Sequence, residues 1–102
     1  MSTDTLHLVL TFHWYDETAK ATDPKRIEYR KMSPKWMRDI YENRHLIAKV
    51  RFARGYTKTT SLFTVTSIDI GECPIAGWSG DFIRIHFTDL PANTPGDDAI
   101  LS

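Results

Sequence analysis

A short charged segment carries the residues whose types and spacing are best suited to chemistry. Lys25, Glu28 and Arg30 follow the turn-forming pair Asp23-Pro24, and the segment is typical of a strand. Because side chains alternate between the two faces of a strand, Glu28 and Arg30 share a face. Lys25 stands at the start of the strand, where its long side chain can reach over a pocket. A lysine beside a glutamate suits proton transfer, because each favours the charged form of the other while burial opposes both charges.

The same segment also fits a simpler interpretation. It can be a solvated edge strand with surface ion pairs, which contribute little to stability or function. The two interpretations differ in one observable, namely whether the Lys25 amine and the Glu28 carboxylate meet inside a concave cavity with aromatic walls.

Size and charge limit the classes of function. A chain of 102 residues predicts one domain with one core. Thirteen basic and thirteen acidic side chains cancel, so any contact with RNA needs a local basic patch. The one cysteine, Cys73, suits a reducing compartment. Because we find no signal-peptide pattern and no apolar run near the ~18 residues of a membrane helix, we expect a cytoplasmic protein without membrane contact.

In the first half of the chain, the pattern predicts two strands and two helices. Alternating apolar residues predict a strand from Leu6 to Phe12 that Trp14-Tyr15 closes. Asp16 is the predicted cap of a helix that runs to about Ala21. After the charged strand, 25–30, Ser33-Pro34 predicts the start of a second helix, whose apolar stripe is Trp36, Met37, Ile40 and Tyr41.

The second half of the chain is predicted to be β-structure. A strand from Leu46 ends in Arg54-Gly55-Tyr56, followed by a polar hairpin tip and a long β-branched run, 61–70, which is one strand or two joined by a bend. An irregular loop, 71–80, precedes the last strand. Residues 1–5 and 89–102 are predicted to be flexible ends of a domain that spans 6–88.

These elements predict an α+β fold. About five or six strands, with two helices in the first half, indicate a small mixed β-barrel with helices packed on one side. His7 and His13 form no metal-site spacing with a cysteine or carboxylate, so we expect no metal and no other cofactor.

Several of these segments together resemble the ASCH domains of the PUA-like superfamily, in particular small bacterial and phage members. The resemblance rests on Trp14-Tyr15-Asp16, on Lys25-x-x-Glu28-x-Arg30 before the Trp36 helix, on Val50 to Tyr56, and on the closing strand Phe82 to Phe87. The family motif is G-x-K-x-x-E-x-R, and Asp23 stands here in place of its glycine.

The resemblance implies a PUA-like β-barrel with a pocket above the charged strand. Some family members are amidohydrolases that remove the acyl group from N4-acylated cytidines, and Lys25 matches their lysine. Where small amidohydrolases can carry a threonine nucleophile, this chain has Glu28, so the hypothesis makes Glu28 the base that activates water and Lys25 the group that stabilises the oxyanion. Arg30, Arg54, Tyr56 and Trp14 are the predicted substrate-binding residues, with the two aromatic rings against the base.

Other functions remain open. The chain can be an RNA-binding module for single-stranded RNA, with a basic surface made of Arg51, Arg54, Lys58, Arg84, Lys25 and Arg30. It can also be a ribonuclease with Lys25 and Tyr56 as candidates, or an interaction domain that uses Trp78. The neutral net charge and the Lys25–Glu28 pair favour a small nucleoside-like ligand over a long phosphate chain.

Overall fold

The structure, a computed structural model, describes residues 4–20 and 22–89. Within these ranges lie five strands and two helical regions, both in the first half of the chain. In chain order the elements are β1 (Thr5–Leu10), α1 (Phe12–Ala19), β2 (Ile27–Arg30), α2 (Pro34–Trp36), the π-helical turn η1 (Met37–Tyr41), the 3₁₀ turn η2 (Arg44–Leu46), β3 (Lys49–Arg54), β4 (Thr60–Glu72) and β5 (Asp81–Thr88).

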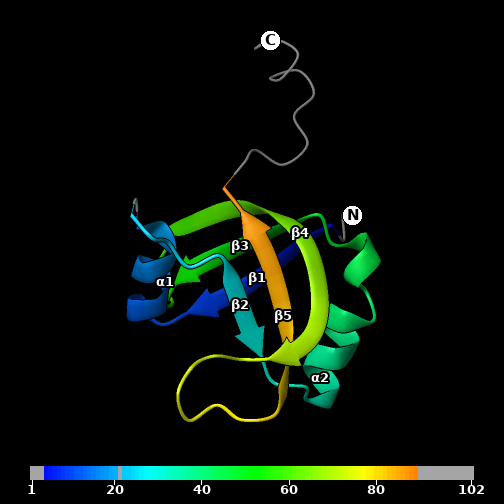
Figure 1. The fold of residues 1–102 in the computed structure, drawn as a ribbon. Coiled ribbons are helices and arrows are strands. Elements are labelled where there is room, and N and C mark those ends of the chain that lie inside the picture. The colour runs from blue at the N-terminus through cyan, green and yellow to red at the C-terminus, as the bar shows by residue number, and fades with distance from the viewer. Residues whose placement is uncertain (1–3, 21, 90–102) are drawn as a thin grey trace, which may run out of the picture.

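The five strands form one sheet in the order β1-β3-β4-β5-β2. Strand β1 runs parallel to β3, and the other neighbouring strands are antiparallel. The sheet curls into a half-barrel, with α1 and α2 on opposite sides of it (Figure 1). The curl brings the two edge strands together, since Arg30 Nη2 of β2 donates to the Val9 carbonyl of β1 at 3.2 Å. The predicted α+β fold built on a curled β-sheet is confirmed, whereas the prediction that both helices pack on one side of it is wrong.

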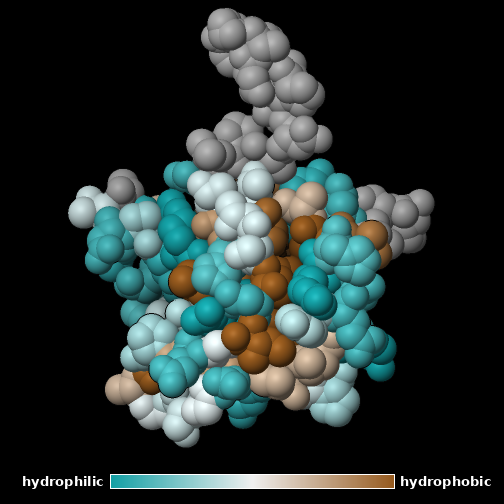
Figure 2. Space-filling model, turned by 45° about the vertical axis from the view of Figure 1, so that its right-hand side comes forward, coloured by the Kyte–Doolittle hydropathy of each residue, from teal (hydrophilic) through white to brown (hydrophobic). Residues whose placement is uncertain are grey.

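The inner face of the half-barrel holds the hydrophobic core. Val50, Phe52, Ile83 and Ile85 are completely buried. Their alternation along β3 and β5 follows the period of two that the sequence shows in these strands. Hydrophobic side chains also gather in a stripe on the face shown in Figure 2, flanked by hydrophilic ones.

The β-branched run forms one long strand with an irregularity. Within β4 the pairing with β5 shifts between Val65 and Ser67, so Val65 pairs with Phe87 and Ile68 with Ile85. A bulged residue changes the alternation, which lets Val65 and Ile68 face the core although three positions separate them.

The start of the first helix was predicted wrongly. Instead of being capped by Asp16, α1 begins at Phe12, and the Thr11 hydroxyl accepts a hydrogen bond from Trp14 N at 3.3 Å. Threonine is a favoured cap because its oxygen satisfies a free N–H of the first turn. Trp14 and Tyr15 are therefore helical, while Phe12 is half exposed and does not join the strand's apolar face.

The second helix starts as predicted. The Ser33 hydroxyl accepts from Trp36 N, Pro34 occupies the first turn, and Ile40 from the apolar stripe is completely buried. In the turn after β3, Gly55 has φ +59°, and a Cβ there would collide with the Phe12 ring. The glycine predicted to allow a sharp turn thus also makes room for an aromatic side chain of α1.

Three of the described residues lie in the predicted flexible ends, and one of them, Thr5, belongs to β1 instead. Asp4 O accepts backbone hydrogen bonds from Ala48 and Lys49, and Asp89 pairs with Arg26 at 3.3 Å. The rest of those ends, 1–3 and 90–102, lies outside the described residues. Within the described ranges, no helix combines the length and the apolar character that crossing a membrane requires.

Candidate active site

The charged side of β2 faces the interior of the half-barrel. Glu28 pairs with Ile85 of β5 and Arg30 with Ile83, and directly paired residues point to the same side of a sheet. Both isoleucines are completely buried, and Glu28 itself is only 8% exposed. β2 is an edge strand, as the simpler interpretation has it, but its charged side is not solvated and its ion pairs do not lie on the surface.

Glu28 joins two cations in one network. The Lys25 ammonium group donates to Glu28 Oε1, while Arg30 Nε donates to Glu28 Oε2 at 3.2 Å. The Lys25 and Arg30 side chains are 16% and 19% exposed. Two cations against one carboxylate leave an excess positive charge, which is a suitable environment for an oxyanion or an anionic product.

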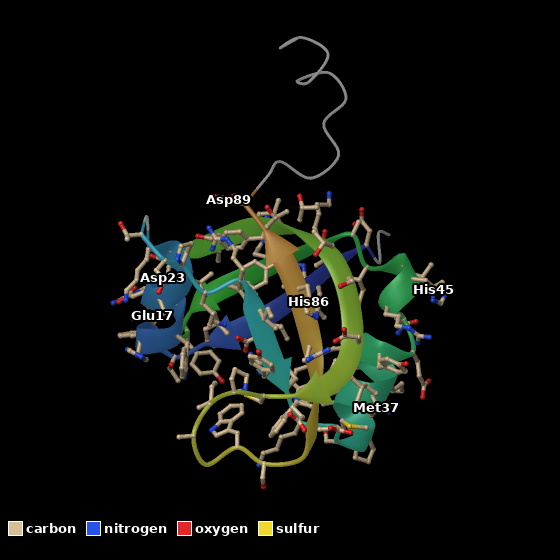
Figure 3. All side chains as sticks on the ribbon, viewed as in Figure 1. Glu17, Asp23, Met37, His45, His86 and Asp89 are labelled. Carbon is tan, nitrogen blue, oxygen red and sulfur yellow. The ribbon has the colours of Figure 1, made fainter. Side chains whose placement is uncertain are left out.

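The end of α1 fixes the position of Lys25. The Lys25 backbone N–H donates to the Glu17 carbonyl at 3.2 Å, and Arg26 Nη1 donates to the Thr18 carbonyl at 3.0 Å. Asp23 has φ +53°, a left-handed conformation that turns the chain from the helix into β2. Figure 3 shows Glu17 and Asp23 on the same side of the molecule, beside α1.

Aromatic rings surround the ammonium group. The Lys25 Nζ atom lies 5.8 Å from the centre of the Trp14 ring, and 5.9 Å from the centres of the Phe52 and Phe87 rings. Ring faces attract a cation, so these contacts offset part of the cost of burying the charge. The sequence named Lys25 and Trp14 as candidate site residues, and the fold brings these two side chains together.

A cleft of about 470 Å³ opens above this network. It lies between the edge strands, with Glu28 and Arg30 in its lining, and all three tryptophans of the chain, Trp14, Trp36 and Trp78, line it. A cleft of this volume suits a small ligand, and indole rings suit the flat face of a heterocycle.

Two further cavities adjoin the cleft. A second cleft, also about 470 Å³, shares Arg30 and Trp36 with the first and extends along β1 to Tyr56. A hollow of about 40 Å³ lies beside the ion pair, lined by Trp14, Lys25, Glu28, Tyr29, Ile75 and Trp78.

The structure does not bring two of the predicted residues into the first cleft. Arg54 pairs with Asp16, with Nε 3.0 Å from Oδ1, and its guanidinium stacks on Phe12 at 4.1 Å. Tyr56 is 96% exposed and lines the second cleft. The basic surface predicted for RNA is also partly neutralised, because Arg84 donates two hydrogen bonds to Asp69.

Sequence reasoning did not assign to the site three aromatic residues that line the cleft or the hollow, nor Ile75, which lines the hollow. Trp36 was assigned only to the apolar stripe of the second helix, Trp78 only to a possible interaction domain, and Tyr29 was given no role. Burial raises the pKa of the Tyr29 phenol. The sequence offered one sign that Trp78 could line a site, namely that this large aromatic residue lies in a glycine-rich loop and not in a strand or helix.

Comparison with known proteins gives no match. No family model, no curated protein and no solved structure is significantly similar to this chain. Within the described ranges, no three His, Cys, Asp or Glu side chains gather as they would around a metal ion. The assignment of function therefore rests on the geometry of the cleft.

Proposed function

We propose that the chain is an amidohydrolase with a PUA-like ASCH fold that removes the acyl group from N4-acylated cytidine. One observation carries the proposal. The Lys25–Glu28–Arg30 network and all three tryptophans line the same cleft and the hollow that adjoins it. The tryptophans offer a stacking surface for the base, and the network offers the charges that hydrolysis of an amide requires.

The turn before Lys25 supports the proposed family. The ASCH motif has glycine two positions before its lysine, and glycine is the residue that adopts positive φ without strain. Asp23 occupies that position here with φ +53°. Aspartate tolerates this conformation better than most residues, so the substitution is compatible with the same turn.

In the proposed reaction Glu28 acts on water and Lys25 acts on the acyl oxygen. A carboxylate has about four acceptor positions, so one hydrogen bond from Lys25 and one from Arg30 leave others for a water molecule. The water oxygen bonds to the acyl carbon as Glu28 takes a proton, and the Lys25 ammonium stabilises the oxyanion. The C–N4 bond then breaks, and the proton passes from Glu28 to the leaving nitrogen. The products are cytidine and a carboxylate.

Arg30 has a positioning part in this scheme. Its guanidinium holds Glu28 Oε2, contacts the Val9 carbonyl across the cleft, and stacks on the Trp36 ring at 5.3 Å. These contacts fix the carboxylate relative to both walls.

The test is hydrolysis of N4-acetylcytidine, followed by chromatography of the released cytidine. We expect turnover by the wild type, and a fall in kcat/KM of about 100-fold or more in Glu28→Gln and Lys25→Met, the usual size for loss of acid–base catalysis. Glu42→Gln, an exposed carboxylate outside the cleft, is the matched control and should retain activity. No turnover by the wild type, or turnover that survives Lys25→Met, would contradict the proposal.

A second candidate is a binding module for single-stranded RNA. The second cleft supports it, because an exposed tyrosine at its far end offers a stacking surface for a neighbouring base. Its test is titration with a short single-stranded RNA at increasing salt. The affinity for RNA should fall as the salt concentration rises, and it should be lower in Tyr56→Ala than in the wild type. Weak binding whose affinity does not change with salt concentration would argue against this candidate.

A further inference from the structure

The small hollow beside the ion pair has a defined relation to the main cleft. The two cavities share Trp14, Glu28, Tyr29 and Trp78, while Lys25 and Ile75 line the hollow and not the cleft. The groups assigned to the chemistry therefore lie at the junction of a large and a small space.

The two spaces differ in what they can hold. An amide has a substituent on each side of its carbonyl carbon. A pyrimidine nucleoside needs the larger space, which is about 470 Å³ and has indole walls. The hollow of about 40 Å³ has room for little more than a water molecule or a methyl group. With the carbonyl beside the Lys25–Glu28 pair and the base in the cleft, the acyl substituent points into the hollow.

We propose that this hollow is the acyl subsite and that it restricts hydrolysis to amides of the shortest acids. The inference rests on the proposed function and adds to it the class of acyl group, with acetyl accepted and propionyl and benzoyl rejected. Ile75 lines the hollow and also a neighbouring cleft of about 360 Å³, so we expect the size of its side chain to limit the space available to the acyl group.

The loop after β4 holds this residue in place. Trp78 N donates to the Ile75 carbonyl at 3.0 Å, which closes a turn with Gly77 at φ +87°. A positive φ at the third residue of a turn is the geometry that glycine favours. The Trp78 ring packs against Phe82, whose centre lies 5.3 Å away, and Phe82 is buried in β5. The hollow therefore has a fixed wall.

The test compares kcat/KM for N4-acetyl-, N4-propionyl- and N4-benzoylcytidine. The wild type should prefer acetyl over benzoyl by about 100-fold or more, because the hollow has too little space for a phenyl ring. Ile75→Ala should raise the benzoyl-to-acetyl ratio by about 10-fold or more. Ile75→Val removes one methylene and should raise the propionyl-to-acetyl ratio, which keeps the test valid if the alanine variant does not fold.

Ser79→Ala lies in the same loop outside the lining and is the matched control, with ratios expected to equal those of the wild type. Similar wild-type rates for all three amides, or unchanged ratios in both Ile75 variants while acetyl turnover persists, would overturn the acyl subsite alone. Absence of turnover on every amide would overturn the subsite together with the proposed function.

Discussion

The Lys25 ammonium group donates directly to a carboxylate oxygen of Glu28, and both side chains are more than four-fifths buried. In a buried pair of this kind each charge depends on its partner, because too little water reaches either group to solvate its charge alone. Arg30 completes the arrangement by contacting the second carboxylate oxygen. The relationship therefore concerns stability as well as chemistry.

We expect Lys25 and Glu28 to be strongly coupled in unfolding experiments. Lys25→Met and Glu28→Gln should each lower the free energy of unfolding by about 1–3 kcal/mol, because each leaves a buried charge with fewer partners. The double variant should cost clearly less than the sum, with a coupling energy of about 1–3 kcal/mol by urea unfolding. The control is the exposed pair Lys35–Asp39, at 2.9 Å, whose coupling should stay below about 0.5 kcal/mol. Equal couplings in the two cycles would contradict the buried network.

The turn before Lys25 should require a left-handed backbone conformation at Asp23. Because its φ is +53°, Asp23→Gly should leave stability unchanged or raise it. Asp23→Val should lower the free energy of unfolding by more than about 1 kcal/mol, since a β-branched residue disfavours this conformation. Thermal unfolding of the two variants measures the difference. A valine variant as stable as the glycine variant would show that the turn does not require left-handed geometry.

Gly71 should be needed because the Arg84 guanidinium lies across it. A Cβ on Gly71 would collide with Arg84, whose side chain is held by two hydrogen bonds to Asp69, at 2.8 and 3.0 Å. We expect Gly71→Ala to lower the free energy of unfolding by about 1 kcal/mol in the wild type. In an Arg84→Ala background the same change should be neutral or stabilising by about 0.5–1 kcal/mol, the usual gain over glycine within a strand. Identical effects in the two backgrounds would exclude the contact as the cause.

Asp69 should contribute to the loss of stability, measured as the free energy of unfolding, that occurs as the pH is lowered. The Arg84 guanidinium holds the pKa of the Asp69 carboxyl below its usual value, and His86 acts in the same direction against partial burial. The contribution is therefore fully present above about pH 4, where the unfolded chain is ionised, and is lost as pH falls through the lowered folded-state pKa. Since the side chain is 46% exposed, we expect less than about 1 kcal/mol. Unfolding of wild type and Asp69→Asn from pH 2 to 7 should show stability curves that converge at the acid end; a constant separation would disprove the assignment.

Much of the fold was predictable from local patterns. The helix start at Ser33-Pro34, the turn at Gly55 and the alternating strands around Phe52 and Ile85 follow from capping, backbone freedom and the strand period. The start of α1 was missed because Thr11 and Asp16 are both acceptable caps, and alternation through Phe12 favoured a longer strand.

The site was predictable only along β2. Lys25, Glu28 and Arg30 are close in sequence, so strand geometry alone relates them. Whether that face points inward depends on β5 lying beside β2, a pairing between segments about 57 residues apart (Ile85 with Glu28) that local patterns do not encode. The same reason explains why Trp36 and Trp78, from a helix and a distant loop, were not linked to Trp14.

The hydrogen bond from Arg30 to the Val9 carbonyl has a consequence for self-association. Unpaired backbone groups at the border of a sheet can template pairing with another molecule, and proteins commonly cover them. Here a guanidinium from the opposite border occupies one such carbonyl, so the opening of the cleft is shielded against recruiting a foreign strand. Arg30, to which we give a positioning part in the proposed reaction, would then protect the protein from aggregation as well.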